Sequence, residues 1–115
     1  MARGDVVRVE LPSFVRGSGH EQTGTRPAVA VQANVPGTST VMIIPFTSQL
    51  SALHFPYTFR VEPSPANGLD RPSVLLVSQL RAIDRRRILD TLGYLEPEYM
   101  SQLEQELQRL LNLGY

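Results

Sequence analysis

Apolar residues recur through most of the chain in short runs of strand length, and this spacing is the feature that most limits the possible fold. Near the start, Val7, Val9 and Leu11 alternate with Arg8 and Glu10, the period-two pattern of a half-buried strand. Similar segments, separated by residues that favour turns and loops, predict further strands at 27–32, 41–46, 57–61 and 74–77.

The last segment has a different spacing. Pro97 stands where a first helical turn accepts proline, and the apolar residues that follow recur at helical intervals: Met100, Leu103, Leu107, Leu110 and Leu111. We therefore expect a mostly β protein with one amphipathic C-terminal helix packed on a small, strongly bent sheet or barrel. Residues 1–115 are expected to form a single domain, and residues 85–95 fit either a helix or a strand.

Composition argues against several classes of function. The chain has no cysteine, which excludes disulfides and thiolate chemistry, and its net charge of zero argues against binding nucleic acid by bulk charge. The two histidines, His20 and His54, belong to no metal-binding pattern, so we expect no metal and no cofactor. No apolar run approaches the roughly 20 residues of a membrane span, and no signal region is evident, so a cytoplasmic protein is expected.

Polar residues that could carry chemistry gather in three places. The loop 17–27 ends in Arg26–Pro27, at the start of an expected strand, and Pro27 favours an extended backbone at Arg26. Thr47 and Ser48 follow the apolar run 41–46, and a third polar set, 78–84, follows the run 74–77. If the strands 27–32 and 41–46 lie in one sheet, Arg26 and Thr47 can meet at its edge.

Four stretches resemble the MazF/PemK family of toxin mRNA interferases, in the order of that family and over most of the chain. They are Arg3-Gly4-Asp5-Val6, the block 19–27 with its Gly-x-Glu-Gln-x-Gly-x-Arg-Pro pattern, Pro45-Phe46-Thr47-Ser48, and the block 79–84. The resemblance implies an SH3-like small barrel, the PemK/CcdB-like toxin fold, and a homodimer. It also implies a sequence-specific, metal-independent endoribonuclease that cleaves single-stranded mRNA. A cognate antitoxin with an acidic, disordered C-terminal segment would inhibit it.

The resemblance also implies which residues act. Arg26 and Thr47 match the family's catalytic arginine and threonine, and His20 matches a histidine that some plasmid-borne relatives use. Those relatives also use an arginine and an aspartate where this chain has Leu76 and Ser78, so we expect it to depend on Arg26 and Thr47. In such a reaction the 2′-hydroxyl of the RNA attacks the neighbouring phosphate and leaves a 5′-hydroxyl end. An arginine can hold the phosphate oxygens, a threonine can position them, and a histidine can move a proton.

Other residues are candidates for contact with the RNA bases and phosphates. Phe14 in the first long loop could stack on a base, with Phe55 and Tyr57 as weaker candidates. The remaining candidates lie in the matched blocks or beside them: Ser18, Glu21, Gln22, Ser48, Gln79 and Arg81.

Other interpretations remain open at this point. Each of these residues could serve the structure alone: Arg26 by pairing with Asp5 or Glu21, and Thr47 by closing a turn. The run Arg85-Arg86-Arg87 is expected to be a solvated face, or otherwise a contact for phosphate or an acidic partner. The alternative functions are a gyrase poison like the CcdB toxins and a catalytically silent SH3-like module that binds a peptide or RNA.

Overall fold

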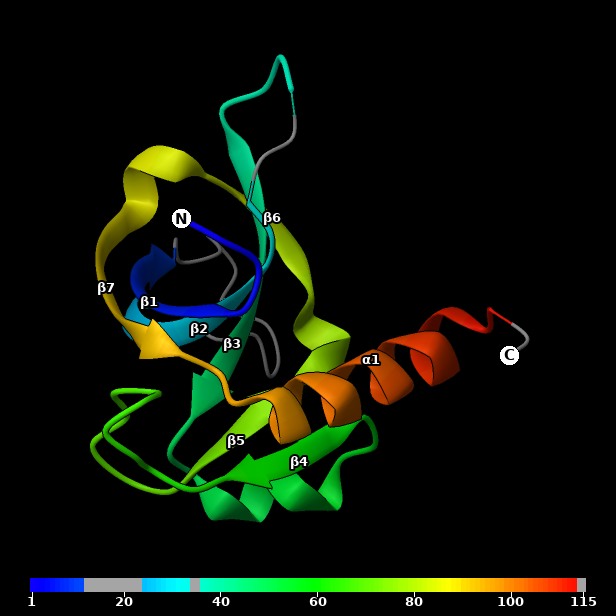
Figure 1. Cartoon of the computed structure of the whole chain (residues 1–115). Coiled ribbons are helices and arrows are strands. Elements are labelled where there is room, and N and C mark those ends of the chain that lie inside the picture. Colours follow the sequence, from blue (N-terminus) through cyan, green and yellow to red (C-terminus); the bar gives the residue numbers. More distant parts are fainter. Residues whose placement is uncertain (12–23, 34–35, 114–115) are drawn as a thin grey trace.

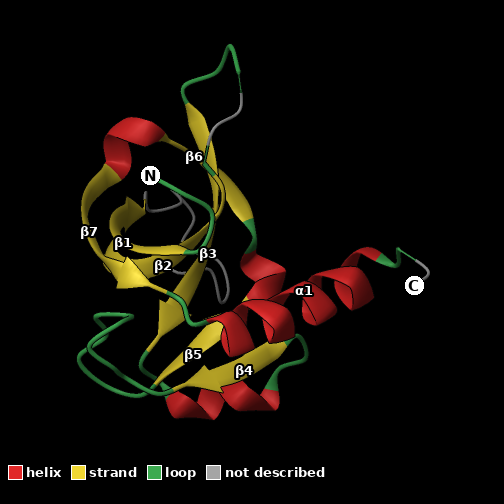
Figure 2. Cartoon of the chain, in the orientation of Figure 1, coloured by secondary structure: helices red, strands yellow, loops and turns green. Residues whose placement is uncertain are grey.

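The computed structural model describes residues 1–11, 24–33 and 36–113, and within these residues it contains seven strands, three short 3-10 helices and one α-helix (Figures 1 and 2). The strands are β1 (Asp5–Leu11), β2 (Gly24–Gln32), β3 (Thr40–Thr47), β4 (Thr58–Val61), β5 (Ser73–Leu76), β6 (Arg81–Asp84) and β7 (Ile88–Tyr94). The helices are η1 (Leu50–His54), η2 (Val77–Gln79), η3 (Arg85–Arg87) and α1 (Pro97–Leu111). The predicted strands and the C-terminal helix are confirmed.

The strands form one bent antiparallel sheet in the order β4-β5-β3-β2-β1-β7, with β6 also paired to β3. Strand β3 joins the two parts of this sheet because it changes partner along its length. Its first half, from Thr40 to Ile43, pairs with β6, whereas Phe46 and Thr47 at its end pair with β5. In Figure 1, β1, β2, β3, β6 and β7 curl around one another, while β4 and β5 lie below them beside α1.

The central strands are buried on both faces. Side chains of neighbouring residues point to opposite faces, as the pleat of a strand requires. On one face, Val6 and Ile44 pack with Leu103 of α1, and on the other face Val7 and Ile43 pack in a separate cluster of buried residues from β1, β2, β3 and β6. Two-sided burial explains why 41–46 reads as a continuous apolar run rather than as an alternation.

Four features differ from the sequence-based expectation, and the smallest is that Val77, expected at the end of the strand 74–77, begins η2. Strand β2 begins at Gly24, so Arg26 lies inside the strand and pairs with Val9 of β1 rather than standing before it. Strand β6 was not predicted, because its residues are mostly part-exposed and lack clear alternation. Residues 85–95, which fitted two structures, form η3 followed by β7, whose pairing with β1 is broken by register shifts that disturb a period-two pattern.

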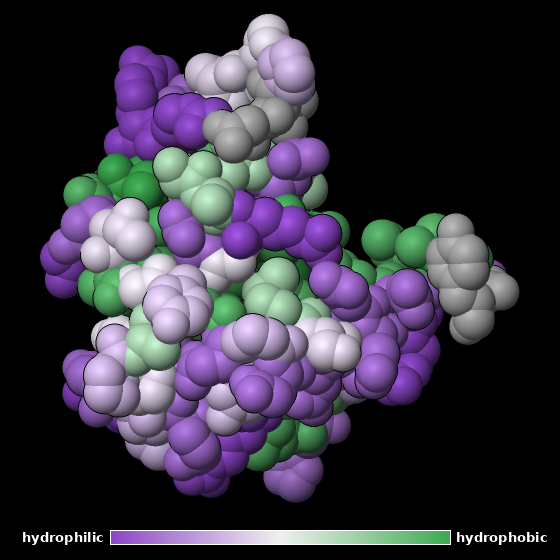
Figure 3. Space-filling model, viewed as in Figure 1, coloured by the Kyte–Doolittle hydropathy of each residue, from purple (hydrophilic) through white to green (hydrophobic). Residues whose placement is uncertain are grey.

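Helix α1 covers the core with one face along most of its length, from Tyr99 to Leu110. Leu103 is fully buried, and Met100 and Leu107 pack against the same cluster. The far end of the helix projects from the sheet, and Figure 3 shows apolar surface there, where Leu111 and Leu113 are about half exposed. Leu111 is therefore not a core residue of this chain, although the spacing placed it in the apolar stripe. Within the described residues, no helix is both long enough and apolar enough to cross a membrane.

The loop between β4 and β5 is held tightly against β7. Tyr94 donates its backbone N–H to the carbonyl of Ala66 at 2.9 Å. A Cβ on Gly93 would lie 2.1 Å from that same carbonyl oxygen, and a Cβ on Gly68 would lie 2.2 Å from the carbonyl oxygen of Leu92. Only glycine permits this approach of two backbones. The path of the loop towards β5 is thus set by the packing.

The side chain of Asp84 caps η3, and its hydrogen bonds make the stability of the fold depend on pH in the acidic range. It accepts the Arg86 backbone N–H at 2.9 Å and the Arg86 guanidinium at 3.0 and 3.1 Å. These hydrogen bonds lower the pKa of Asp84 from 3.8 to about 2.

We therefore expect Asp84 to contribute stability that is fully present above about pH 5 and is lost as the pH falls through about 2, because over this range the unfolded chain binds the proton more tightly than the folded protein does. Thermal unfolding followed by circular dichroism over this range should show a shallower loss of Tm for Asp84→Asn than for the wild type. Parallel curves for the two proteins would contradict this assignment.

Candidate active site

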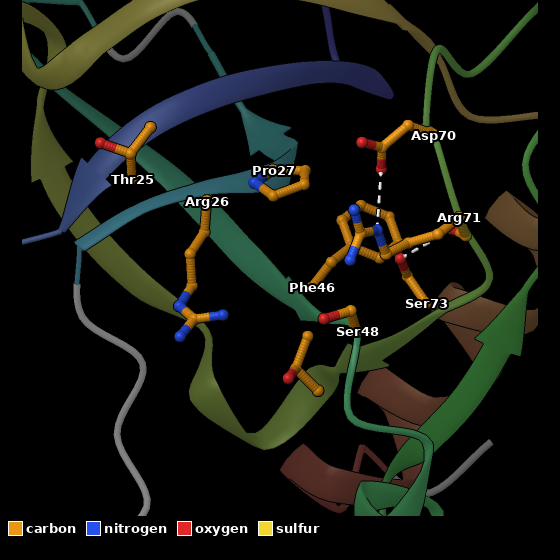
Figure 4. Close-up of a pocket in the computed structure, with 9 residues that line it drawn as sticks. Thr25, Arg26, Pro27, Phe46, Ser48, Asp70, Arg71 and Ser73 are labelled. Atoms are coloured by element: carbon orange, nitrogen blue, oxygen red, sulfur yellow. Dashed lines mark hydrogen bonds and ion pairs between the residues drawn. The ribbon is translucent and has the colours of Figure 1, made fainter.

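A pocket of about 200 Å³ opens where the start of β2, the end of β3 and the approach to β5 meet (Figure 4). Its walls carry two arginines, one aspartate and several hydroxyl groups. The residues that line it are Thr25, Arg26, Pro27, Phe46, Thr47, Ser48, Asp70, Arg71 and Ser73.

The register of β2 and β3 brings Arg26 and Thr47 together. Ala28 pairs with Pro45 in this antiparallel ladder. Arg26 lies two residues before Ala28 and Thr47 two residues after Pro45, so both lie in the same direction from that pair. Two residues restore the same face of a strand, so the two side chains project to the same side of the sheet. The structure thus brings together two of the three predicted catalytic residues.

Thr47 is held rigidly at this pocket. Its side chain is only 4% exposed, and its Oγ1 accepts the backbone N–H of Gln49 at 3.2 Å. With an acceptor position of the hydroxyl used in this way, its O–H can donate into the pocket. Such a hydroxyl suits the binding of a phosphate oxygen better than the removal of a proton.

Arg26 is half-buried on β2, and the following Pro27 limits its backbone to an extended conformation. Its guanidinium presents five N–H donors in a planar fork. Figure 4 shows the side chain extending from β2 on one side of the pocket. Arg26 also has an interaction within the protein, so its position is restrained.

The opposite wall comes from residues that the sequence pattern did not single out. Thr47 pairs with Val74, so the residues just before β5 lie beside those just after β3. Asp70 and Arg71 reach the pocket in this way, and Figure 4 shows Arg71 entering from the side opposite Arg26. One signal was present in the sequence: Arg71-Pro72 precedes the strand predicted at 74–77, and Arg26-Pro27 stands at the start of the strand predicted at 27–32.

The other predicted residues fall into three groups. Ser48 lines the same pocket. Arg81 pairs with Ile43, four residues from Thr47 along β3, or about 13 Å at strand spacing, and Gln79 in η2 lies outside the pocket lining as well. The remaining candidates lie outside the described residues: Phe14, Ser18, His20, Glu21 and Gln22.

The arginine run 85–87 has structural contacts. Arg86 pairs with Asp84, and Arg85 donates to the carbonyl of Ala33 at 2.8 Å. His54 ends η1 and is exposed. In the described part of the chain, no three His, Asp or Glu side chains are grouped so that they could hold a metal ion.

Guanidinium groups and hydroxyl donors around a small pocket suit one kind of ligand above others. Arginine forks match the oxygens of a phosphate, and the hydroxyls of Thr47, Ser48 and Ser73 add neutral donors. The carboxylate of Asp70 beside them makes the site less positive than the arginines alone would. The arrangement can hold and polarise a phosphodiester.

Comparison with known proteins points the same way. Residues 2–111 match the family described as PemK-like, MazF-like toxin of type II toxin-antitoxin system. The chain is 31% identical to Endoribonuclease EndoA of Bacillus subtilis over 113 residues, which cover 96% of this chain and 94% of the relative.

Solved structures share the fold. The Mycobacterium tuberculosis toxin MazF-mt6 superposes with a TM-score of 0.73 at 18% identity, covering 96% of this chain and 99% of that one. A mycobacterial endoribonuclease in complex with its cognate antitoxin gives a TM-score of 0.73 at 21% identity, covering 98% and 96%. The expected toxin fold, a mostly β sheet with a C-terminal helix, is thereby confirmed.

Proposed function

The chain belongs to the PemK-like, MazF-like family of toxins of type II toxin-antitoxin systems, and we propose that it is an endoribonuclease that cleaves single-stranded mRNA without a metal. The observation that carries this proposal is the juxtaposition of Arg26 and Thr47 in the lining of one pocket. The name of the Bacillus relative supports the same activity. Neither a gyrase poison nor a silent binding module requires this pair of side chains.

The proposed reaction uses the RNA as its own nucleophile. The 2′-hydroxyl loses its proton and forms a bond to the adjacent phosphorus, while the bond from phosphorus to the 5′-oxygen breaks and that oxygen gains a proton. Negative charge builds up on the non-bridging oxygens in between. We assign the binding of these oxygens to Arg26, which lines the pocket and whose planar guanidinium can offer two N–H donors at once.

Thr47 has a positioning role in this reaction, because a neutral hydroxyl is a poor base. Its Oγ1 is fixed by the Gln49 N–H, which leaves its O–H to orient the phosphate. His20, which lies outside the described residues, stays a prediction as the group that moves a proton.

Thr47→Val keeps the shape of this buried side chain and removes the hydroxyl, so we expect kcat/KM for RNA cleavage to fall about 10- to 100-fold. Thr47→Ser keeps the hydroxyl and should retain most of the activity. Initial cleavage rates of the wild type and the two variants test this, measured at a temperature well below the Tm of all three proteins. Equal rates for the valine and serine variants would remove Thr47 from the mechanism.

The proposed partners follow from the family. We place the activity in the cytoplasm, where mRNA is available, and expect a homodimer inhibited by a cognate antitoxin. An acidic antitoxin segment lying over the pocket would compete with RNA for the same arginines.

The decisive experiment is incubation of the purified protein with a long single-stranded RNA in the presence of EDTA, followed by mapping of the cut ends. We expect cleavage at a short recurring sequence, with 5′-hydroxyl ends. A supercoiling assay with DNA gyrase, run on the same preparation, should show no inhibition. Intact RNA together with inhibited gyrase would overturn the proposal.

A further inference from the structure

We propose that Arg71 is a second phosphate-binding residue of this pocket and that the neighbouring carboxylate of Asp70 holds it back until RNA displaces it. The inference rests on the proposed function, because it names a further contact that the same RNA strand makes. Arg71 stands on the wall opposite Arg26, and both arginines line one pocket of about 200 Å³ (Figure 4).

The fold delivers Arg71 to this position with little freedom in the backbone. The preceding loop is tied to β7 at Gly68 and Gly93, where the two backbones touch. Pro72 restricts the backbone of Arg71, and the buried side chain of Ser73 donates its hydroxyl to the Arg71 carbonyl at 3.1 Å. The backbone that carries the Arg71 side chain is therefore held beside the pocket before RNA binds.

The ion pair that Arg71 makes in the free protein is weak. Its Nε lies 3.4 Å from Oδ1 of Asp70, and the two side chains are 65% and 83% exposed. Exposed pairs of this kind are largely screened by water. A phosphate offers the guanidinium two oxygens at once, so RNA can replace Asp70 at small cost.

The contrast with Arg26 predicts which kinetic constant Arg71 affects. Arg26 is half-buried beside the fixed hydroxyl of Thr47, where a charge that develops in the transition state is poorly screened. Arg71 is exposed, so water screens its interaction with any charge that develops there, and we expect it to bind substrate and transition state about equally. Uniform binding of this kind changes KM and leaves kcat unaltered.

The first test compares Arg71→Gln with Arg60→Gln as its matched control, because Arg60 also pairs with a nearby carboxylate, that of Glu62, but does so outside the pocket. We expect Arg71→Gln to raise KM for RNA cleavage about fivefold and to change kcat less than about twofold. Binding of 2′-O-methylated single-stranded RNA, which carries phosphates but no nucleophile, gives a second readout. A plot of log affinity against log salt concentration should be less steep for Arg71→Gln than for the wild type, by about 0.7 in slope. Arg60→Gln should alter none of these quantities.

The second test uses a variant that is expected to change KM in the opposite direction. Asp70→Asn removes the restraint on Arg71 and a negative charge from the pocket, so KM should fall about two- to threefold. If Arg71 served only the structure, Asp70→Asn would lower KM by the same factor in the wild type and in an Arg71→Gln background, whereas a restraint on Arg71 predicts a smaller fall in that background. Circular dichroism and Tm measured on each variant separate a folding defect from a binding defect.

The outcomes distinguish this inference from the proposed function. If the wild type cleaves RNA and Arg71→Gln behaves like Arg60→Gln, the inference is wrong and the proposed function stands. If the wild type does not cleave RNA, the proposed function is wrong, and the salt dependence of binding to the 2′-O-methylated RNA still decides whether Arg71 contacts phosphate. An unchanged slope, or no binding of that RNA by the wild type, would overturn the role of Arg71.

Discussion

Arg26→Ala is expected to lower kcat/KM for RNA cleavage by about 10²- to 10³-fold, which is the usual effect of removing one preorganised donor from a developing oxyanion. The loss should appear mainly in kcat, because the charge that Arg26 faces in the half-buried pocket grows as the phosphorane forms. Single-turnover cleavage of an RNA that spans a mapped cut site measures this directly.

Arg26→Lys provides the control for charge alone. Lysine keeps the positive charge but lacks the planar fork of donors, so its activity should lie between those of the wild type and the alanine variant. Because Arg26 also has a contact within the protein, the Tm of both variants must be compared with that of the wild type. A folded Arg26→Ala protein that cleaves at the wild-type rate would end the assignment of Arg26.

Asn67→Ala is expected to have the largest effect on stability, about 3 kcal/mol, because it removes a buried amide that makes four hydrogen bonds, one of them buried and three part-buried. The amide of Asn67 is fully buried. Its Nδ2 donates to the Glu62 carbonyl at 2.9 Å and to Glu96 Oε1 at 3.1 Å, and its Oδ1 accepts the backbone N–H groups of Ser64 and Leu69 at 3.1 and 3.0 Å. Urea unfolding of the two proteins measures the difference.

Asn67→Asp separates the hydrogen bonds from the packing. It keeps the shape and the acceptor oxygen but sets a carboxylate against that of Glu96. Like charges in contact favour binding of a proton by the folded state, so the stability of this variant should rise, relative to Asn67→Ala, as the pH is lowered from about 8 to about 5. Equal pH dependence of the two variants would mean that the interaction with Glu96 contributes nothing.

The Asn67 network also links stability to the site. It fixes the loop that ends at Asp70 and Arg71, so a loosened loop should weaken RNA binding before it affects the chemistry at Arg26. We therefore expect the folded fraction of Asn67→Ala to show a raised KM and a kcat close to that of the wild type.

The sequence by itself determined the local elements and half of the site. Alternating and continuous apolar runs predicted five of the strands, because side chains two residues apart lie on the same face of a strand. Helical spacing predicted α1. The Arg26–Pro27 dipeptide and the polar end of 41–47 predicted the first wall of the pocket, because both lie on neighbouring strands that a short antiparallel connection brings together.

Only the tertiary structure decided the second wall. Asp70 and Arg71 lie more than twenty residues after Thr47 in the chain, and they reach it because β3 exchanges β6 for β5 as its partner at Phe46. Periodicity records which face of a segment is buried but not which other segment covers its edge. The choice of partner strand follows from the packing of the whole sheet. The same packing produces the close backbone contacts of Gly68 and Gly93 and the hydrogen bonds of Asn67, which together position the loop that carries Asp70 and Arg71.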